Sequence, residues 1–136
     1  MIKRKSVSVS LEEDLFTAFE RYVKEKNYKT RSKAIADIIR NEIAKKEILK
    51  GNDVIGIISL IYNHHKRELT DTITDIQHHH HKLILSSLHI HLDKDNCLEV
   101  IITRGDGSEI QKLKDTIKST KGVLHCSLNT MPGKIF

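Results

Sequence analysis

The segment LHIHLDKDNCLEV, residues 88–100, carries two histidines and a cysteine at spacings that suit metal coordination. In a strand, His89 and His91 point to the same face, because successive side chains alternate between faces. The apolar residues around them would then point to the core: Leu88, Ile90 and Leu92. Imidazole and thiolate groups are ligands of borderline transition-metal ions. The segment therefore predicts part of a metal site.

A hairpin would bring the cysteine to the face that carries the histidines. If the polar residues after Leu92 form a turn symmetric about Lys94, His91 lies opposite Cys97 and His89 lies opposite Glu99. The two imidazoles and the thiolate would supply three ligands, and the carboxylate could accept a hydrogen bond from an imidazole N–H. The alternative is a pair of surface histidines beside a chance cysteine.

A fourth ligand must come from outside the hairpin, and the run His78 to His81 offers four candidates. The run ends a predicted helix, where imidazolium groups are also favoured by the helix dipole alone. The residue types select neither one of the four nor the metal: planar four-coordination favours Ni(II) or Cu(II), and tetrahedral coordination favours zinc. His64 and His65 could form a weaker second site or an ordinary exposed turn.

Six elements must position these residues. Beyond Gly51–Asp53, the apolar pattern predicts a βαββαβ order, with strands at 54–63, 82–92, 96–104 and 122–131 and helices at 65–80 and 106–119. That order predicts a ferredoxin-like fold, an antiparallel four-stranded sheet with both helices on one face. The other face would need a cover, so we expect an oligomer.

The first 50 residues form a separate basic module. They hold 13 Lys and Arg against 8 Asp and Glu, which accounts for the whole net charge of +5 and favours a polyanionic partner. Strict alternation of serine and valine predicts a strand at 6–10. Apolar residues that recur at helical spacing predict helices at 12–25 and 31–46. We expect Ser10 to cap the first helix and Asn27 to end it in the left-handed conformation.

Strand, helix, helix with a basic N-terminus is typical of the ribbon–helix–helix arrangement, in which a two-stranded ribbon enters the major groove. Fewer than 50 residues cannot bury a real core, so we expect the module to dimerise through its short strand. The alternative is an ordinary helical dimerisation domain. In the ribbon, Val7 and Val9 would face the dimer core, leaving Ser6, Ser8 and Ser10 for DNA.

Composition narrows the class further. The chain has 136 residues, 38% of them hydrophobic and 30% charged, and no apolar run long enough to span a bilayer. The basic N-terminus is not followed by the apolar segment of a secretory signal, so we expect a cytoplasmic protein with free thiols. Cys126 lies in an apolar stretch and is expected to be a small buried side chain.

Taken together, these motifs closely resemble the nickel-responsive regulators of the NikR family. The similarity extends over nearly the whole chain, through the segments SVSVSLEEDL, NYKTRSKAIADIIR, IYNHHKREL, IQHHHH, LHIHLDKDNCLE and KGVLHCSL. The resemblance implies an α+β protein with a ribbon–helix–helix DNA-binding domain at 1–50. A ferredoxin-like (ACT-type) nickel-binding and tetramerisation domain would follow at 54–136. The assembly would be a homotetramer, a dimer of dimers.

The resemblance also implies a ligand set that the residue types left open. One square-planar Ni(II) per subunit would be held by His89, His91 and Cys97 of one chain and His78 of another. Three further residues match positions that surround the ion in the family: Tyr62, Gln77 and Glu99. The implied function is a nickel-dependent transcription regulator, not an enzyme, that binds double-stranded operator DNA and represses nickel-uptake genes.

Two other classes compete with this interpretation. A metalloenzyme would need an open ligand position beside Glu99 to activate water, and a fourth protein ligand would close that position. A ribbon–helix–helix protein without a metal, such as an antitoxin or a regulator with a small-molecule ACT domain, would not need the histidines.

The expected DNA contacts lie in two places. At the N-terminus they are Lys3, Arg4, Lys5, Ser6, Ser8 and Ser10, and at the start of the helix 65–80 they are Lys66 and Arg67, which would touch phosphates. Ser6 and Ala36 stand where the family commonly has Arg, which puts those contacts in doubt. Lys33 replaces a family Glu that, with the residue matching Asp37, binds a monovalent cation. Its ammonium could take the cation's place or simply be solvated.

Overall fold

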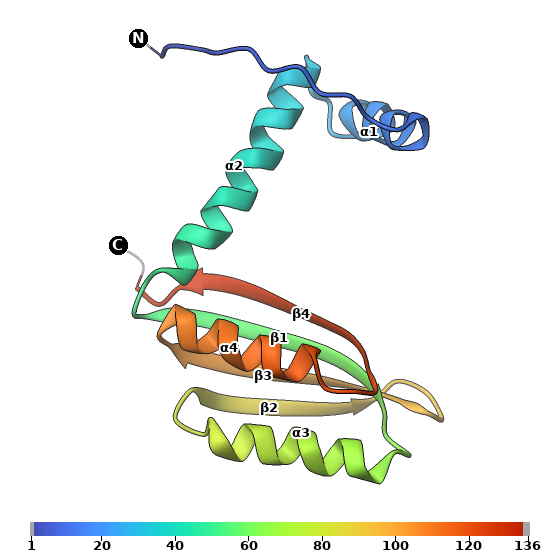
Figure 1. Cartoon of the computed structure of the whole chain (residues 1–136), viewed down its shortest axis with the longest axis vertical. Helices are drawn as coiled ribbons and strands as arrows, with labels where there is room; N and C mark the ends of the chain where they lie inside the picture. Colours follow the sequence, from blue (N-terminus) through green and yellow to red (C-terminus); the bar gives the residue numbers. More distant parts are fainter. Residues whose placement is uncertain (1, 135–136) are drawn as a thin grey trace. The chain divides into compact units, whose positions relative to one another are not determined.

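The structure is a computed structural model that describes residues 2–134 (Figure 1). The chain divides into two compact units, Met1–Glu42 and Ile43–Phe136. The described elements, in chain order, are α1 (Glu13–Glu25), α2 (Arg31–Leu49), β1 (Val54–Asn63), α3 (Arg67–His79), β2 (Ile84–His91), β3 (Asn96–Gly105), α4 (Gly107–Lys118) and β4 (Val123–Pro132). None of the helices in the described part is long and apolar enough to cross a membrane.

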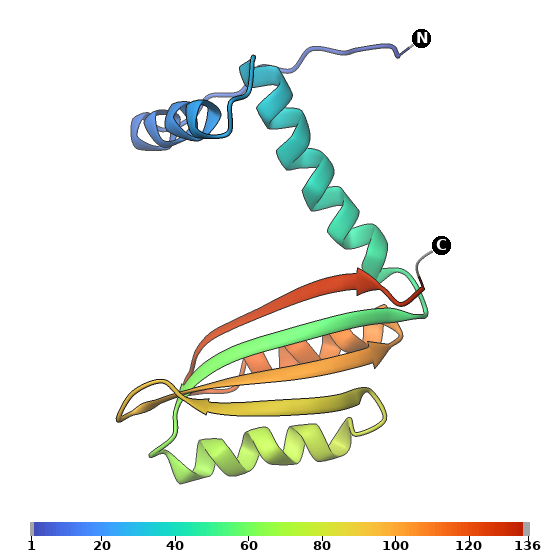
Figure 2. The same ribbon diagram turned by 180° about the vertical axis from the view of Figure 1, so that it is seen from behind.

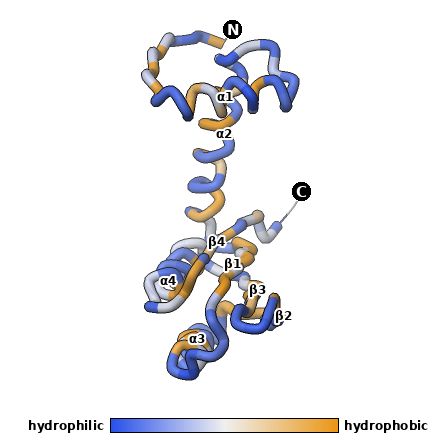
Figure 3. The backbone as a smooth tube through the Cα atoms, turned by 90° about the vertical axis from the view of Figure 1, so that its right-hand side faces the viewer, coloured by the Kyte–Doolittle hydropathy of each residue, from blue (hydrophilic) through white to orange (hydrophobic). Residues whose placement is uncertain are grey.

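The first unit contains α1, which is amphipathic, and most of α2 (Figure 3). Asn27 has φ 58°, which confirms the predicted left-handed end of α1. The predicted cap at Ser10 is wrong, because α1 begins later and Glu12 holds the capping position without a side-chain hydrogen bond. At α2, by contrast, Thr30 Oγ1 accepts a hydrogen bond of 3.1 Å from the Lys33 amide.

Residues 6–10 form no strand in the single chain. A strand needs a hydrogen-bonding partner, and the partner expected for this segment is the same segment of a second copy. Val7 and Val9 are exposed, as are apolar residues along both helices: Leu15, Phe16, Ile35, Ile38, Ile39 and Ile43. The ribbon therefore stays a prediction that concerns a dimer.

The second unit has the predicted βαββαβ order. Its antiparallel sheet has the strand order β2-β3-β1-β4 of a ferredoxin-like fold (Figures 1 and 2). Every predicted boundary in this unit lies within two residues of the observed one, and β1 agrees at both ends. The strands are rich in β-branched residues, which favour strands and so make the strand boundaries readable from the sequence.

One hydrophobic core lies between the sheet and its two helices. Leu69 and Ile73 of α3 join Leu113 and Ile117 of α4 in the same buried cluster, which confirms that both helices lie on one face. The sheet contributes alternate residues to this cluster: Ile58, Leu60, Tyr62, Cys97, Ile101 and Cys126. Cys126 is buried as predicted.

Within the second unit, no described helix covers the opposite face of the sheet (Figures 1 and 2). Leu88 is 57% exposed and Ile90 is 39% exposed, so the prediction that these residues and Leu92 face the core is wrong for one chain. The alternation was right, but the histidines, not the leucines, share the face that the helices cover. The reason is pairing: His91 lies opposite Cys97, whose side chain is buried on the helix side.

Candidate metal centre

The hairpin β2–β3 has the register that the sequence predicts, with His91 opposite Cys97 and His89 opposite Glu99. A local turn sets this register. The Asp93 carboxylate accepts hydrogen bonds from the amides of Asp95 at 2.9 Å and Asn96 at 2.8 Å, an arrangement that favours a tight turn. These amides hold the pKa of Asp93 below its ordinary value.

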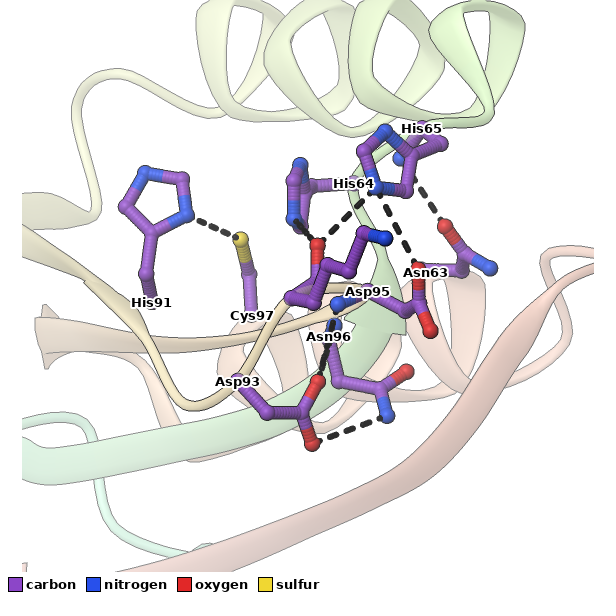
Figure 4. Close-up of polar contacts among 9 residues, drawn as sticks. Asn63, His64, His65, His91, Asp93, Asp95, Asn96 and Cys97 are labelled. Atoms are coloured by element: carbon purple, nitrogen blue, oxygen red, sulfur yellow. Dashed lines mark hydrogen bonds and ion pairs between the residues drawn. The ribbon is translucent and has the colours of Figure 1, made fainter.

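Cys97 lies at the centre of a group of possible ligands (Figure 4). Its side chain is fully buried, and its Sγ lies 3.6 Å from His91 Nδ1. Ligand atoms of His64, His91 and Cys97 all lie within 4.8 Å of one another. Burial, followed by the charges of Glu99 and Asp93, raises the pKa of the Cys97 thiol. The thiol is therefore neutral until a cation or a higher pH favours the thiolate.

His89 lies beside this group and is oriented by a carboxylate. Its Nδ1 lies 3.2 Å from Glu99 Oε1, and the Glu99 side chain is nearly buried. With Nδ1–H donating to Glu99, the lone pair of Nε2 is free to bind a metal ion. A bound imidazole needs this support to keep one tautomer and one ring direction.

Glu99 is in turn held by two other elements. Gln77 at the end of α3 donates from Nε2 to Glu99 Oε2 at 2.5 Å, and Tyr62 of β1 donates to Glu99 Oε1 at 3.4 Å. Burial, followed by the Glu99 charge, raises the pKa of Tyr62, so its hydroxyl remains a donor. The three residues expected around the ion, Tyr62, Gln77 and Glu99, thus form one hydrogen-bonded network behind His89.

Sequence reasoning did not place His64 in this centre. Its ring centroid lies 4.9 Å from that of His91, and its Nε2 donates to the Lys94 carbonyl oxygen at 2.7 Å. His65 donates to the same oxygen at 2.9 Å. Spacing along the chain gives no signal for this contact. It follows from the pairing of Asn63 with Asn96, which brings the end of β1 to the tip of the hairpin.

The four histidines at the end of α3 divide into two kinds. His79, His80 and His81 donate from Nδ1 to backbone carbonyl oxygens at 2.8, 3.0 and 3.1 Å, which satisfies carbonyls at the helix end. The His78 side chain makes no such bond among the described contacts, and it is exposed. It borders a hollow of about 280 Å³ with Gln77, His81 and Ile84.

His78 does not reach the centre within one chain. Gln77 points to Glu99, and successive residues of a helix are rotated by about 100°. The adjacent His78 side chain therefore points elsewhere. Within the described residues, one chain brings together His89, His91, Cys97 and His64 but leaves out the predicted fourth ligand.

The basic residues expected to contact DNA are exposed. Lys66 and Arg67 stand at the start of α3 and line a hollow of about 540 Å³ together with Lys121. Lys3, Arg4 and Lys5 are exposed in the segment before α1. Ser6, Ser8 and Ser10 are exposed there too.

The carboxylate of Asp37 is engaged by residues of its own unit. It accepts a hydrogen bond of 2.9 Å from the Tyr28 hydroxyl and pairs with Arg40 Nη1 at 2.6 Å. No hydrogen bond or ion pair joins the Lys33 side chain to Asp37 among the described residues, so the solvated alternative for Lys33 agrees better with the structure. The positive charge beside Asp37 is Arg40, one helical turn further along α2.

Comparison with known proteins gives consistent similarities. Residues 55–131 match the family described as NikR C terminal nickel binding domain. A protein of Syntrophus aciditrophicus is 48% identical over 121 residues, covering 89% of this chain and 88% of its own. A protein of Dictyoglomus turgidum is 46% identical over 129 residues, covering 94% of this chain and 96% of its own. A protein of Methanothrix thermoacetophila is 43% identical over 126 residues, covering 91% of this chain and 90% of its own.

All three relatives are described as candidate nickel-responsive regulators. Among solved structures, the ACT domain from the GTP pyrophosphokinase of Chlorobium tepidum has a TM-score of 0.48 and 17% identity, covering 57% of this chain and 99% of that domain.

Proposed function

This chain belongs to the NikR family of nickel-responsive regulators, and we propose that it binds double-stranded operator DNA when Ni(II) is held between two of its subunits. It is a nickel-dependent regulator rather than an enzyme. The proposed target is the operator of nickel-uptake genes, which the nickel-bound protein would repress from the cytoplasm. The observation that carries the proposal is the cross-strand group of His89, His91 and Cys97 beside the Glu99 network.

The donor set fits a borderline divalent ion. Cys97 supplies one buried sulfur, and His89 and His91 supply nitrogens on the same sheet face. Glu99 would keep Nε2 of His89 available by accepting from Nδ1. Bound Ni(II), one per subunit, would join the side chains of two chains by coordination.

The proposed fourth ligand is His78 of a second copy. Three observations support it: His78 is exposed, Gln77 and not His78 bonds Glu99 in the same chain, and the three histidines that follow His78 donate to helix carbonyls. His64 is the competing candidate, because it already lies beside His91 and Cys97 in one chain. Substitution of each histidine separates the two possibilities.

The uncovered apolar surfaces support an oligomer. Leu88, Ile90 and Leu92 are exposed on the open face of the sheet, next to the partly exposed Ile102. Contiguous apolar surface of this kind marks an interaction site. We propose that second copies cover both this face and the apolar stripes of α1 and α2, which would give a homotetramer built as a dimer of dimers.

The proposed DNA contacts combine two exposed basic surfaces. Pairing of residues 6–10 with the same segment of a second copy would place Ser6, Ser8 and Ser10 on the outer face of a ribbon. Lys3, Arg4 and Lys5 would contact the backbone beside it. Lys66 and Arg67 at the start of α3 would contact phosphates and so position the protein without reading sequence.

Nickel and DNA would favour each other through α3. Gln77 ties the end of this helix to Glu99, and the next residue is the proposed ligand of another subunit. A metal ion shared in this way would hold α3 against its neighbour, and Lys66 and Arg67 begin the same helix. Linkage then requires that DNA raise the affinity for nickel by the factor by which nickel raises the affinity for DNA.

Operator binding tests the proposal directly. The full-length protein is titrated onto DNA of the promoter regions of nickel-uptake genes with stoichiometric Ni(II), with Zn(II) or Co(II) as controls, and without metal. We expect tight, sequence-selective binding with Ni(II) and weak binding otherwise. Equal binding in all four conditions would overturn nickel dependence, and no binding in any of them would overturn the DNA-binding function.

A further inference from the structure

A bidentate ion pair joins three chain segments at the edge of the second unit. Arg104, near the end of β3, donates from Nε to Asp53 Oδ1 at 2.9 Å and from Nη2 to Asp53 Oδ2 at 3.1 Å. The same Nη2 donates to the Gly133 carbonyl oxygen at 3.2 Å, and the Gly133 amide donates to the Asp53 carbonyl oxygen at 2.8 Å. Two parallel hydrogen bonds set the orientation of the guanidinium relative to the carboxylate as well as the distance between them.

The start of α4 closes on the same region from another side. The Gly107 amide donates to the Gly51 carbonyl oxygen at 2.9 Å. A Cβ at Gly107 would lie only 2.0 Å from the Leu49 carbonyl oxygen, so the close approach of α4 to the end of α2 requires glycine. Residues 49–53 are therefore held by β3, by α4 and by the segment after β4.

This arrangement makes the composition of Gly51–Asp53 misleading. A Gly-Asn-Asp segment is typical of a turn between domains, yet here the Gly51 backbone and the Asp53 backbone and side chain are bonded to Gly107, Arg104 and Gly133. The two compact units divide between residues 42 and 43, inside α2, so that the last turns of α2 belong with the sheet.

We propose that Arg104 is a positioning residue that makes residues 43–53 one body with the nickel-binding unit, so that the state of the metal centre is carried into α2. β3 supplies the connection. It holds Cys97 near its beginning and Arg104 near its end, roughly 23 Å apart at the rise of an extended strand. β3 pairs with β1 along its whole length, which keeps it stiff. The regulatory part of this inference rests on the proposed function.

The test uses the full-length protein and the variant Arg104→Ala. Nickel affinity is measured by competition with a chelator, operator affinity with and without Ni(II), and amide hydrogen exchange over residues 43–53 and at Gly133. We expect nickel affinity to change less than about twofold, whereas the gain in operator affinity caused by nickel falls by about fivefold or more. Exchange at Gly133 and over 49–53 should rise.

Three further variants separate positioning from a general structural effect. Lys112→Ala removes an exposed cation that pairs with Glu109 on α4, and it should change none of the three quantities. Arg104→Lys keeps the charge but loses the two-pronged geometry, so it should restore the nickel-induced gain only in part. The exchange of charges, Arg104→Asp with Asp53→Arg, should restore most of it.

Two results would overturn the inference. One is an unchanged nickel-induced gain in Arg104→Ala although exchange at Gly133 rises, and the other is an equal loss of nickel and operator affinity. If the wild-type protein binds no operator, the proposed function fails. The positioning role of Arg104 is then tested by hydrogen exchange alone. Nickel-dependent protection of residues 43–53 that disappears in Arg104→Ala would support the positioning role, and protection that persists would exclude it.

Discussion

His91 lies directly opposite Cys97 in the β2–β3 pair, with its Nδ1 3.6 Å from the cysteine sulfur. The thiol is fully buried, whereas the imidazole is exposed, so this pair joins the protein interior to the surface at which a second copy could complete the site. The first prediction concerns the sulfur.

Cys97→Ser should abolish tight nickel binding. The hydroxyl is a poor ligand for a borderline ion, and loss of a supporting residue alone costs about 10–100-fold in metal affinity. We expect a loss of more than about 100-fold, together with loss of the sulfur-to-metal absorption band. Cys126→Ser is the matched control, because Cys126 is also buried but lies on β4. A variant Cys97→Ser that kept wild-type affinity would exclude the sulfur as a ligand.

His78→Ala and His64→Ala should behave differently. If His78 of a second copy is the fourth ligand, its loss lowers nickel affinity by more than about 10-fold, whereas loss of His64 has little effect. His79→Ala serves as control on the same helix end, since its Nδ1 caps the Asp75 carbonyl. The reverse order in a chelator competition assay would assign the position to His64.

Glu99→Gln should weaken the site without removing a ligand. The amide cannot accept from both Gln77 and His89 as the carboxylate does, so one donor loses its partner. Nickel affinity should fall by about 10–100-fold, and the free energy of unfolding of the metal-free protein by about 1–3 kcal/mol. Nickel titration and urea denaturation measure the two quantities. The control Glu109→Gln, on the exposed face of α4, should change neither of them.

Nickel affinity should rise with pH because of Cys97. Burial raises the pKa of this thiol, and coordination requires the thiolate, so each nickel bound releases a proton until the pH exceeds the raised pKa. The stability of the metal-free protein has the opposite pH dependence and falls as the pH rises. Its neutral buried thiol contributes stability that is complete below the pKa of an unfolded cysteine and is lost as the pH rises through the raised value.

Titrations of nickel affinity and of unfolding free energy between neutral and alkaline pH check both signs. Cys97→Ala should flatten the stability profile. A nickel affinity that did not change with pH would contradict thiolate ligation.

Lys66→Ala combined with Arg67→Ala should weaken operator binding and reduce its dependence on salt. Both side chains are exposed at the start of α3. Each lost phosphate contact lowers the slope of log affinity against log salt by about 0.9. The double variant should bind nickel with wild-type affinity, and its affinity for specific and for nonspecific DNA should fall by similar factors. An unchanged slope in fluorescence anisotropy at several salt concentrations would remove these residues from the interface.

The sequence determined the local order of the second unit and the pairing within its hairpin. Alternation along β2 and the turn residues after it were enough to place His91 opposite Cys97 and His89 opposite Glu99, because a hairpin has few registers compatible with a short polar turn. The basic character of the first 50 residues was equally plain.

Contacts between elements distant in the chain were decided by the tertiary structure alone. Alternation assigns residues to two faces but does not say which face the helices cover, and so Leu88 and Ile90 were placed on the wrong side. His64 joins the metal centre because β1 pairs with β3. Arg104 reaches Asp53 because β3 ends beside the segment that precedes β1. Such contacts depend on how strands stack and helices pack, which spacing along one chain does not encode.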